Sequence, residues 1–559
     1  MEQVGTHTDQ TAQVPGRKAV IVGVGQYRKN PKFDGPFTPW EPARAMADAI
    51  AVALADAQAR SATSANTSQN ASQNSSANSI ANEAGLLACV DPIAWSYDDL
   101  CATTAAMAGI PETVEGVTIP PGGNSPGDLM IQIINRMADG TLSIAVLAGC
   151  ETLYSRRRAI KEGIELEWTP TSAPRDFFKG QRPLTNPLEK RHGLLAPIQC
   201  YPLFENALRF AAGRTVAGHQ LFLGAFMARN AAVAATNPYA WFPNAWTPAQ
   251  IADPTADNRW VCFPYPKRMN AIMEVDLAAA CIIMTEDEAD RRGIPAASRV
   301  AVLGAGSAVD AWTPTERVDF HSSPGIAAAA SAALSHAGVS VDDVDLFDLY
   351  SCFPSAVELA LGELGIAADD PRGVTQTGGL AYAGGPGNSY AMHGLCAIVD
   401  KLRASFGSDG APRVGLVSAL GMTATKHAYM VVSNDPTRIS AADGLGHKVV
   451  MPSASVTGPM LVDEVSGQGV VETYTIEFDR NGSPVRTIIV VRFDDGTRTV
   501  ANGSCSVDEI CALMESEGIG LRVGVIGGSA GEGDANVPNR ATLLSSSAQA
   551  VSLSGTVVL

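Results

Sequence analysis

KAVIVGVGQ at residues 18–26 and RVAVLGAGS at residues 299–307 are the two stretches that decide the fold. Each is an apolar, partly β-branched run that closes on Gly-x-Gly, and helix- and strand-like patterns follow each of them. Two related segments this far apart favour a chain built from two similar α/β halves. A dinucleotide-binding turn is the alternative, but Arg28 and Val309 stand where that fingerprint needs a third small residue. We therefore expect two central strands that turn into loops.

Further strands are predicted in both halves. Residues 142–152, 344–353 and 413–422 are apolar runs without alternation, which is typical of strands buried on both faces between layers of helices. Residues 153–275, between the halves, are rich in charge, aromatic residues and proline, and we interpret them as a long excursion from the first half.

Length and composition limit the classes of function. The chain has 559 residues, too many for one core, with 46% hydrophobic residues and a net charge of −17. Both nucleic acids and anionic membranes need a basic surface, so we expect neither as a partner. No apolar run approaches the roughly 20 residues of a membrane span, and the N-terminus lacks the apolar segment of a signal peptide. We expect a cytoplasmic protein whose ten cysteines are reduced thiols.

The pattern changes after about residue 437. Residues 471–503 alternate with period two, and Asn481-Gly482 and Asp495-Gly496 separate the runs, which is a strong hairpin signal. Strands of this length, followed by one short helical stretch, predict a separate antiparallel β-barrel. Residues 61–83 are low-complexity Ser, Asn, Ala and Gln, which predicts a disordered insertion.

Several motifs together resemble the thiolase superfamily, and within it the thiolase-like proteins type 1. They are AGCETLYS at 148–155, YPLFENALR at 201–209, FPYPKRMNAIMEVDLAAA at 263–280, DLYSCFPSAVELA at 348–360, TGGLAYAGGPGNSYAMHG at 377–394 and SALGMTATKHA at 418–428. The resemblance implies a duplicated thiolase fold of five αβαβα layers with an inserted loop domain, followed by an OB-like C-terminal barrel.

On this basis the chain divides into consecutive segments. They are a disordered tail (1–16), a first thiolase half (17–152 and 276–297), the excursion or loop domain (153–275), a second thiolase half (298–436), the barrel (437–535) and a loose tail (536–559).

The resemblance also implies where catalytic groups belong. Thiolases use a nucleophilic cysteine, a histidine that activates it and a second cysteine that moves the α-proton of a CoA thioester. Here Asn124 stands at the nucleophile position, Gly385 at the histidine position and Ala419 at the second cysteine position. The Gly-rich loop at 378–394 therefore keeps its shape without its acid–base group, and classical thiolysis is doubtful.

Polar residues near these loops form the candidate site. The catalytic candidates are Cys352, His393 and His427, which we hypothesise to cluster as a relocated Cys–His site. Purely structural roles for all three are the alternative. The candidates for substrate binding are Asn124, Gly385, Asn388 and Gly421.

Three other groups of residues are weighed between structural and ligand-binding roles. Asp345 and Asp348 are interpreted as structural. An arginine run and an aromatic cluster are compatible with a CoA phosphate site or a lipid pocket, although solvation and packing are the simpler interpretations; they are Arg156–Arg158 and the set Tyr239, Trp241, Phe242 and Trp246.

The predicted function is the handling of acyl-CoA, with acetyl-CoA acetyltransferase as the family label. The alternative is a non-catalytic protein that binds acyl-CoA or lipid and contacts a partner enzyme through its barrel. A CoA thioester is expected as substrate or ligand, with no metal and no permanently bound cofactor, in a monomer or a dimer.

Overall fold

The computed structural model describes residues 18–62, 80–172, 182–435, 446–449, 458–529 and 536–544. The predicted tail 1–16 and most of the predicted insertion 61–83 lie outside the described residues.

The first thiolase half contributes five strands to the sheet, in the order β3-β2-β4-β7-β1. Its strands are β1 (Ala19–Arg28), β2 (Leu86–Val90), β3 (Glu115–Val117), β4 (Ile144–Thr152) and β7 (Asp276–Thr285). Its helices are α1 (Pro42–Ala62), α3 (Leu100–Ala108), α4 (Ser125–Ala138) and, after β7, α10 (Glu286–Arg291). β1 and β7 are fully buried over most of their length, as expected for strands between two helix layers.

The second half repeats this order as β8-β11-β10-β9, with no described counterpart of β3. Its strands are β8 (Val300–Val309), β9 (Leu346–Asp348), β10 (Val414–Gly421) and β11 (Lys426–Ser433), and its helices are α11 (Pro324–Ala337), α12 (Pro354–Leu364) and α13 (Tyr390–Asp409). The two sheets join where Val20 and Ile21 of β1 pair with Ala301 and Val300 of β8. The duplication predicted from the two Gly-x-Gly runs is therefore confirmed.

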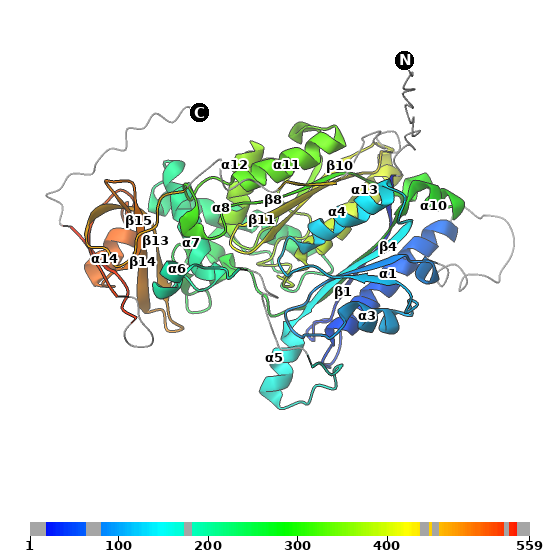
Figure 1. Cartoon of the computed structure of the whole chain (residues 1–559), viewed down its shortest axis with the longest axis horizontal. Coiled ribbons are helices and arrows are strands. Elements are labelled where there is room, and N and C mark those ends of the chain that lie inside the picture. The colour runs from blue at the N-terminus through cyan, green and yellow to red at the C-terminus, as the bar shows by residue number, and fades with distance from the viewer. Residues whose placement is uncertain are drawn as a thin grey trace, which may run out of the picture.

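Five layers result from this arrangement. Helices α4 and α13 contact strands of both sheets and form the middle layer, α1 and α3 cover the first sheet, and α11 and α12 cover the second (Figure 1). The predicted αβαβα architecture is confirmed.

The Gly-x-Gly pairs permit close contact between strand and helix. A Cβ atom on Gly25 would lie 2.3 Å from the backbone oxygen of Ala49 in α1, and one on Gly306 would lie 2.4 Å from that of Ala329 in α11. The glycines bring β1 and β8 against their helices, which explains the repeated motif without a dinucleotide.

The excursion holds mainly helices. They are α5 (Leu153–Glu162), α6 (Pro187–Arg191), α7 (Pro197–Ala211), α8 (Val216–Thr236) and α9 (Pro248–Ala252), followed by short strands β5 (Trp260–Cys262) and β6 (Tyr265–Pro266). Short 3₁₀ turns occur at Lys267–Met269, Ala296–Ser298, Pro314–Glu316 and Val341–Asp343.

The C-terminal domain is a closed five-stranded barrel in the order β13-β14-β15-β17-β16-β13. Its elements are β13 (Gly467–Phe478), β14 (Pro484–Phe493), β15 (Arg498–Asn502), α14 (Val507–Met514), β16 (Arg522–Ile526) and β17 (Arg540–Leu543). Gly482 and Gly496 adopt the positive φ angles that the predicted hairpin turns require.

Two details of the barrel differ from the sequence prediction. Its strand pairs are antiparallel except for β15 with β17, which pair in parallel through Asn502 and Arg540. β17 falls in the segment predicted to be a loose tail, whereas β12 (Gly446–Val449), inside the predicted barrel range, pairs with β8 of the thiolase core. Short strands such as these are specified by their partners more than by their own residues.

The barrel packs on the excursion and on the second half. Asn206 of α7 donates to the carbonyl of Tyr474 at 2.9 Å, and Thr473 donates to the carbonyl of Leu203 at 2.6 Å. The fully buried Arg498 pairs with Glu472 and donates to the carbonyl of Thr315 at 2.7 Å. The barrel is therefore fixed to the core by buried polar contacts.

Candidate functional site

Asn124 lies at the N-terminus of α4, in the middle layer. It is buried, and its Nδ2 donates to Asp128 Oδ2 at 2.8 Å, one turn along the helix. Its Oδ1 accepts no hydrogen bond from the described residues. The Asp128 contact fixes the amide orientation, because a flipped amide would turn its oxygen toward the carboxylate.

Three loops converge on Asn124. Its Oδ1 occupies the space beside two glycines: a Cβ atom would lie 2.4 Å from it on Gly122 and 2.1 Å from it on Gly421. A Cβ atom on Gly123 would lie 2.4 Å from the hydroxyl of Tyr350. The loops that hold Asn124, Tyr350 and Gly421 therefore lie side by side.

The hairpin β10–β11 separates Lys426 from His427. Gly421 pairs with Lys426 and Leu420 with His427, and paired residues share one face of a sheet. Lys426 faces α4, since its Nζ lies 3.1 Å from a Cβ built on Gly122 and donates to the carbonyl of Pro121 at 3.3 Å. His427 lies on the opposite face, 3.5 Å from Asp310. Lys426 is thus the residue of this pair at the site, which the hairpin register would have indicated.

Backbone strain occurs in the turn of that hairpin. Met422 and Ala424 have φ values of 62° and 53°, which residues other than glycine rarely adopt. Such strain is concentrated at functional sites. The backbone N–H of Ala424 donates to the hydroxyl of Tyr201 of α7 at 3.0 Å, so the excursion contributes to this site as well.

Cys352 is half-buried in the loop before α12. Burial raises the pKa of its thiol to about 12, so the thiol stays protonated at neutral pH. The neighbouring Phe353 stacks on Tyr201 with ring centroids 4.5 Å apart. No hydrogen bond to a histidine is formed by Cys352 among the described residues, so the relocated nucleophile lacks its base.

The Gly-rich loop and the Cys352 loop are linked by residues 271–272, whose backbone forms hydrogen bonds with both loops. Gly385 donates to the carbonyl of Ile272 at 2.9 Å, and Ala271 donates to the carbonyl of Cys352 at 3.1 Å. The side chain of Asn388 donates to the carbonyl of Asp91 at 2.8 Å. Asn388 therefore anchors the loop to the first half.

His393 lies apart from these loops, inside α13. Its Nδ1 is 2.9 Å from Gln26 Oε1, and its Nε2 has no partner among the described residues. Burial lowers its pKa to about 4, so the ring is neutral at physiological pH. The adjoining cavity has about 10 Å³, the space of one water. The structure thus places Cys352, His393 and His427 in three separate environments.

The remaining sequence candidates have structural contacts. Asp348 accepts hydrogen bonds from the backbone of Gln376 and Thr377, and Asp345 accepts one from Val414. Arg157 and Arg158 pair with Glu274 and Glu162. Trp241 and Phe242 pack with Tyr154, Val275 and Leu277.

A larger hollow lies elsewhere on the first half. It measures about 520 Å³ and is bounded by α1, α3 and the residues after α5, with Lys29, Trp40 and Trp168 among its walls. None of the predicted site residues lines it.

Comparison with known proteins decides the family of the barrel. Residues 453–527 match the family described as "Thiolase-like protein type 1 additional C-terminal domain". The chain has the thiolase fold with the additional C-terminal domain of the thiolase-like proteins type 1. The resemblance inferred from the motifs is confirmed.

Solved structures agree with this assignment. The crystal structure of a monomeric SCP2-thiolase like protein type 1 from Mycobacterium smegmatis shares 28% identity with a TM-score of 0.75, covering 95% of this chain and 100% of that one. The acetyl-CoA acetyltransferase of Bacillus anthracis has a TM-score of 0.53 at 14% identity, covering 75% of this chain and 99% of that one, which shows the fold alone. No curated protein matches the chain.

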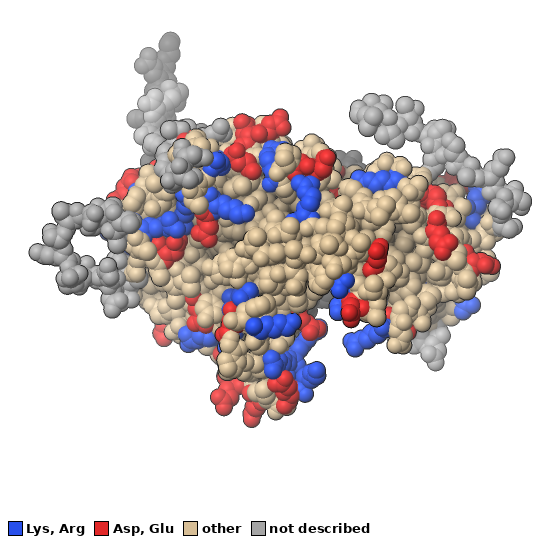
Figure 2. All heavy atoms as spheres, turned by 180° about the vertical axis from the view of Figure 1, so that it is seen from behind, with Lys and Arg blue, Asp and Glu red and all other residues tan. Residues whose placement is uncertain are grey.

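Surface and helix properties bear on the expected partners. Figure 2 shows positive and negative side chains interspersed around one face, with a broad uncharged area between them. Among the described helices, none has the length and apolar character needed to cross a membrane.

Proposed function

We propose that this chain binds an acyl-CoA thioester without covalent catalysis, at the N-terminus of α4. The observation that carries the proposal is the buried amide of Asn124, at the position that the motif resemblance matches to the thiolase nucleophile. An amide does not attack a thioester, and Gly385 and Ala419 supply neither the base nor the second thiol. The helix N-terminus still favours a partially negative carbonyl oxygen.

Two further groups suit this role. Lys426 is a cation beside Gly122 and Asn124, and the carbonyl of a thioester or an anionic group of CoA is a suitable partner for it. The protonated Cys352 thiol offers no alternative nucleophile. Binding without acyl transfer is the chemistry that these groups support.

The proposal is tested with CoA, acetyl-CoA and longer acyl-CoAs. Thermal shift is expected to show stabilisation by at least one acyl-CoA, and mass spectrometry is expected to show no acyl adduct on the protein. Lys426→Ala should weaken binding at least about fivefold, whereas the exposed Glu162→Gln on α5 should leave it unchanged. Absence of any stabilisation, or an adduct on Cys352, would contradict the proposal.

A further inference from the structure

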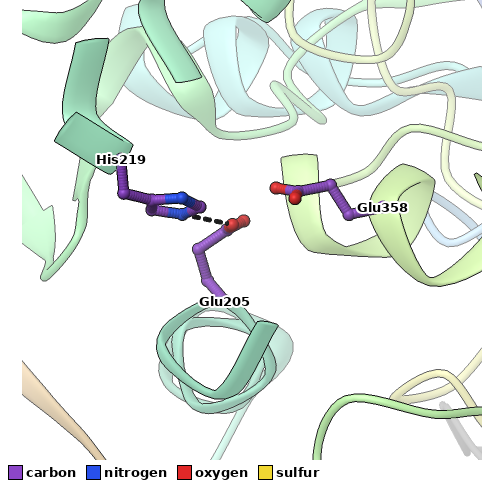
Figure 3. Close-up of side chains that lie close together, drawn as sticks. All are labelled: Glu205, His219 and Glu358. Atoms are coloured by element: carbon purple, nitrogen blue, oxygen red, sulfur yellow. Dashed lines mark hydrogen bonds and ion pairs between the residues drawn. The ribbon is translucent and has the colours of Figure 1, made fainter. Parts of the chain in front are cut away.

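Three buried side chains outside the candidate site meet between the excursion and the second half (Figure 3). They are Glu205 of α7, His219 of α8 and Glu358 of α12. His219 Nε2 lies 2.8 Å from Glu205 Oε1, and one ligand-type atom from each of the three lies within 4.8 Å of the others. These residues have the composition of a metal site or of a proton-sharing pair.

The neighbours of the cluster define its hydrogen bonds. Arg214, in the turn between α7 and α8, donates to Glu358 Oε2 at 3.0 Å and lies 3.3 Å from His219 Nδ1. Since arginine only donates, Nδ1 accepts and the imidazole proton is on Nε2, which donates to Glu205. The hydroxyl of Tyr265 in β6 donates to the other oxygen of Glu205 at 2.6 Å.

One oxygen remains without a donor. Glu358 Oε1 has no hydrogen-bond partner among the described residues, and the side chain is only 9% exposed. A buried carboxylate oxygen needs a proton or a cation. A proton shared with Glu205 supplies the missing bond and gives two carboxyl groups, one guanidinium and a neutral imidazole a net charge of zero.

A divalent metal ion fits the same cluster less well. It would require the lone pair of His219 Nε2, which carries the proton as long as Arg214 donates to Nδ1. It would also place two positive charges beside the Arg214 guanidinium. We propose that Glu205 and Glu358 share one proton, and that this proton holds the excursion helices α7 and α8 against α12 in a pH-dependent manner.

The burial of Glu205 and Glu358 also favours a protonated pair. Burial raises the pKa of both Glu205 and Glu358, and it lowers that of His219 to about 4. The charged groups that face the pair are Arg209 of α7 and Arg214, and the other titratable groups are the neutral His219 and Tyr265 of β6. The native state binds the shared proton more tightly than the unfolded state does. The contribution of this proton to the free energy of unfolding is therefore present at low pH and is lost as the pH rises through the pKa of the pair.

This contact lies one turn from the candidate site on both helices. Tyr201, which accepts the Ala424 N–H, precedes Glu205 by four residues on α7. Ser355, three residues before Glu358 on α12, donates to the carbonyl of Tyr201 at 3.1 Å. Loss of the proton would thus loosen the excursion where it meets the Cys352 loop.

Hydrogen exchange on the ligand-free protein tests the inference independently of the proposed function. After correction for intrinsic exchange, opening of α7, α8 and α12 in the wild type should rise about tenfold from pH 6 to pH 9. Glu358→Gln mimics the protonated acid and should stay within about twofold, while Glu162→Gln should follow the wild type. The same pH dependence in Glu358→Gln as in the wild type would overturn the proposal.

Two further arms cover misfolding and metal. If Glu358→Gln does not fold, hydrogen exchange of the wild type tests the proposal by itself. A pH effect confined to α7, α8 and α12 would support the proposal, and one spread evenly over all helices would overturn it. Zn²⁺ added to the wild type should not raise the melting temperature. If the wild type retains one zinc ion per chain and His219→Ala does not, the cluster is a metal site and the proposal of a shared proton is overturned.

Discussion

Asn124 determines which chemical group the loop before α4 presents to the candidate site. Helix α4, the loop that precedes it and the glycines around it enclose the position predicted to match the thiolase nucleophile, and the atom presented there is an amide oxygen. The side chain is held by Asp128, so it is part of the structure as well as of the site.

Asn124→Ala removes the donor to Asp128 and should lower the free energy of unfolding by about 1–3 kcal/mol. Gln132 is exposed on the same helix, so Gln132→Ala should change it by less than about 0.5 kcal/mol. Urea denaturation at pH 7 measures both. Equal effects of the two substitutions would show that the Asn124–Asp128 contact contributes nothing.

His393 should make stability depend on acidity. Its pKa is lowered to about 4, so its contribution is present above the unfolded value near 6.5 and is lost as pH falls from there to about 4. His393→Gln can keep the bond to Gln26 and should remove a loss on the order of 3 kcal/mol. Denaturation curves of the two proteins at pH 7, 5.5 and 4.5 should diverge on acidification, and parallel curves would contradict the assignment.

The arrangement of strands and helices depends on the glycines that face α1 and α11. Gly306→Ala would place its Cβ 2.4 Å from a backbone oxygen and 2.9 Å from a backbone nitrogen of α11, neither of which can move alone. We expect a loss of about 1–3 kcal/mol or more from this overpacking.

The matched control for this substitution lies in α12. A Cβ atom on Gly362 meets nothing within 4 Å, so Gly362→Ala should be neutral or stabilise by up to about 1 kcal/mol. Thermal unfolding of both variants provides the measurement. A tolerated Gly306→Ala would mean that the close approach of β8 to α11 is not needed.

Sequence patterns predicted elements where local signals are strong. The two Gly-x-Gly runs became β1 and β8, and the Asx-Gly turns became the barrel hairpins. Sequence patterns did not predict β12 and β17, which are four residues long and are positioned by pairing with β8, β15 and β16. Strand register was likewise not predicted at the candidate site. The pairing of Gly421 with Lys426 decides which face of the sheet His427 occupies.

At the scale of the whole molecule, Arg498 joins the barrel to the thiolase core. It is fully buried, and its guanidinium reaches Glu472 within the barrel and carbonyl groups of the loop before α11. A buried arginine with these partners couples the unfolding of two domains.

Arg498→Ala should lower the free energy of unfolding by about 3–5 kcal/mol, because it leaves Glu472 partly unpaired in the interface. Differential scanning calorimetry should then show the barrel melting separately from the core. Arg522, whose partner Asp494 is largely exposed at 3.7 Å, is the control, and Arg522→Ala should cost less than about 1 kcal/mol. A single unshifted transition in Arg498→Ala would contradict this coupling.

The closing strand β17 has a consequence for how the protein is made. The ribosome delivers the barrel strands in chain order, and β15 and β16 have no common neighbour until residues 540–543 have emerged. Until then the nascent domain is an open sheet with two free edges, which are the surfaces that invite aggregation. Protection by a chaperone would therefore matter most in the interval between the emergence of β16 and the docking of β17.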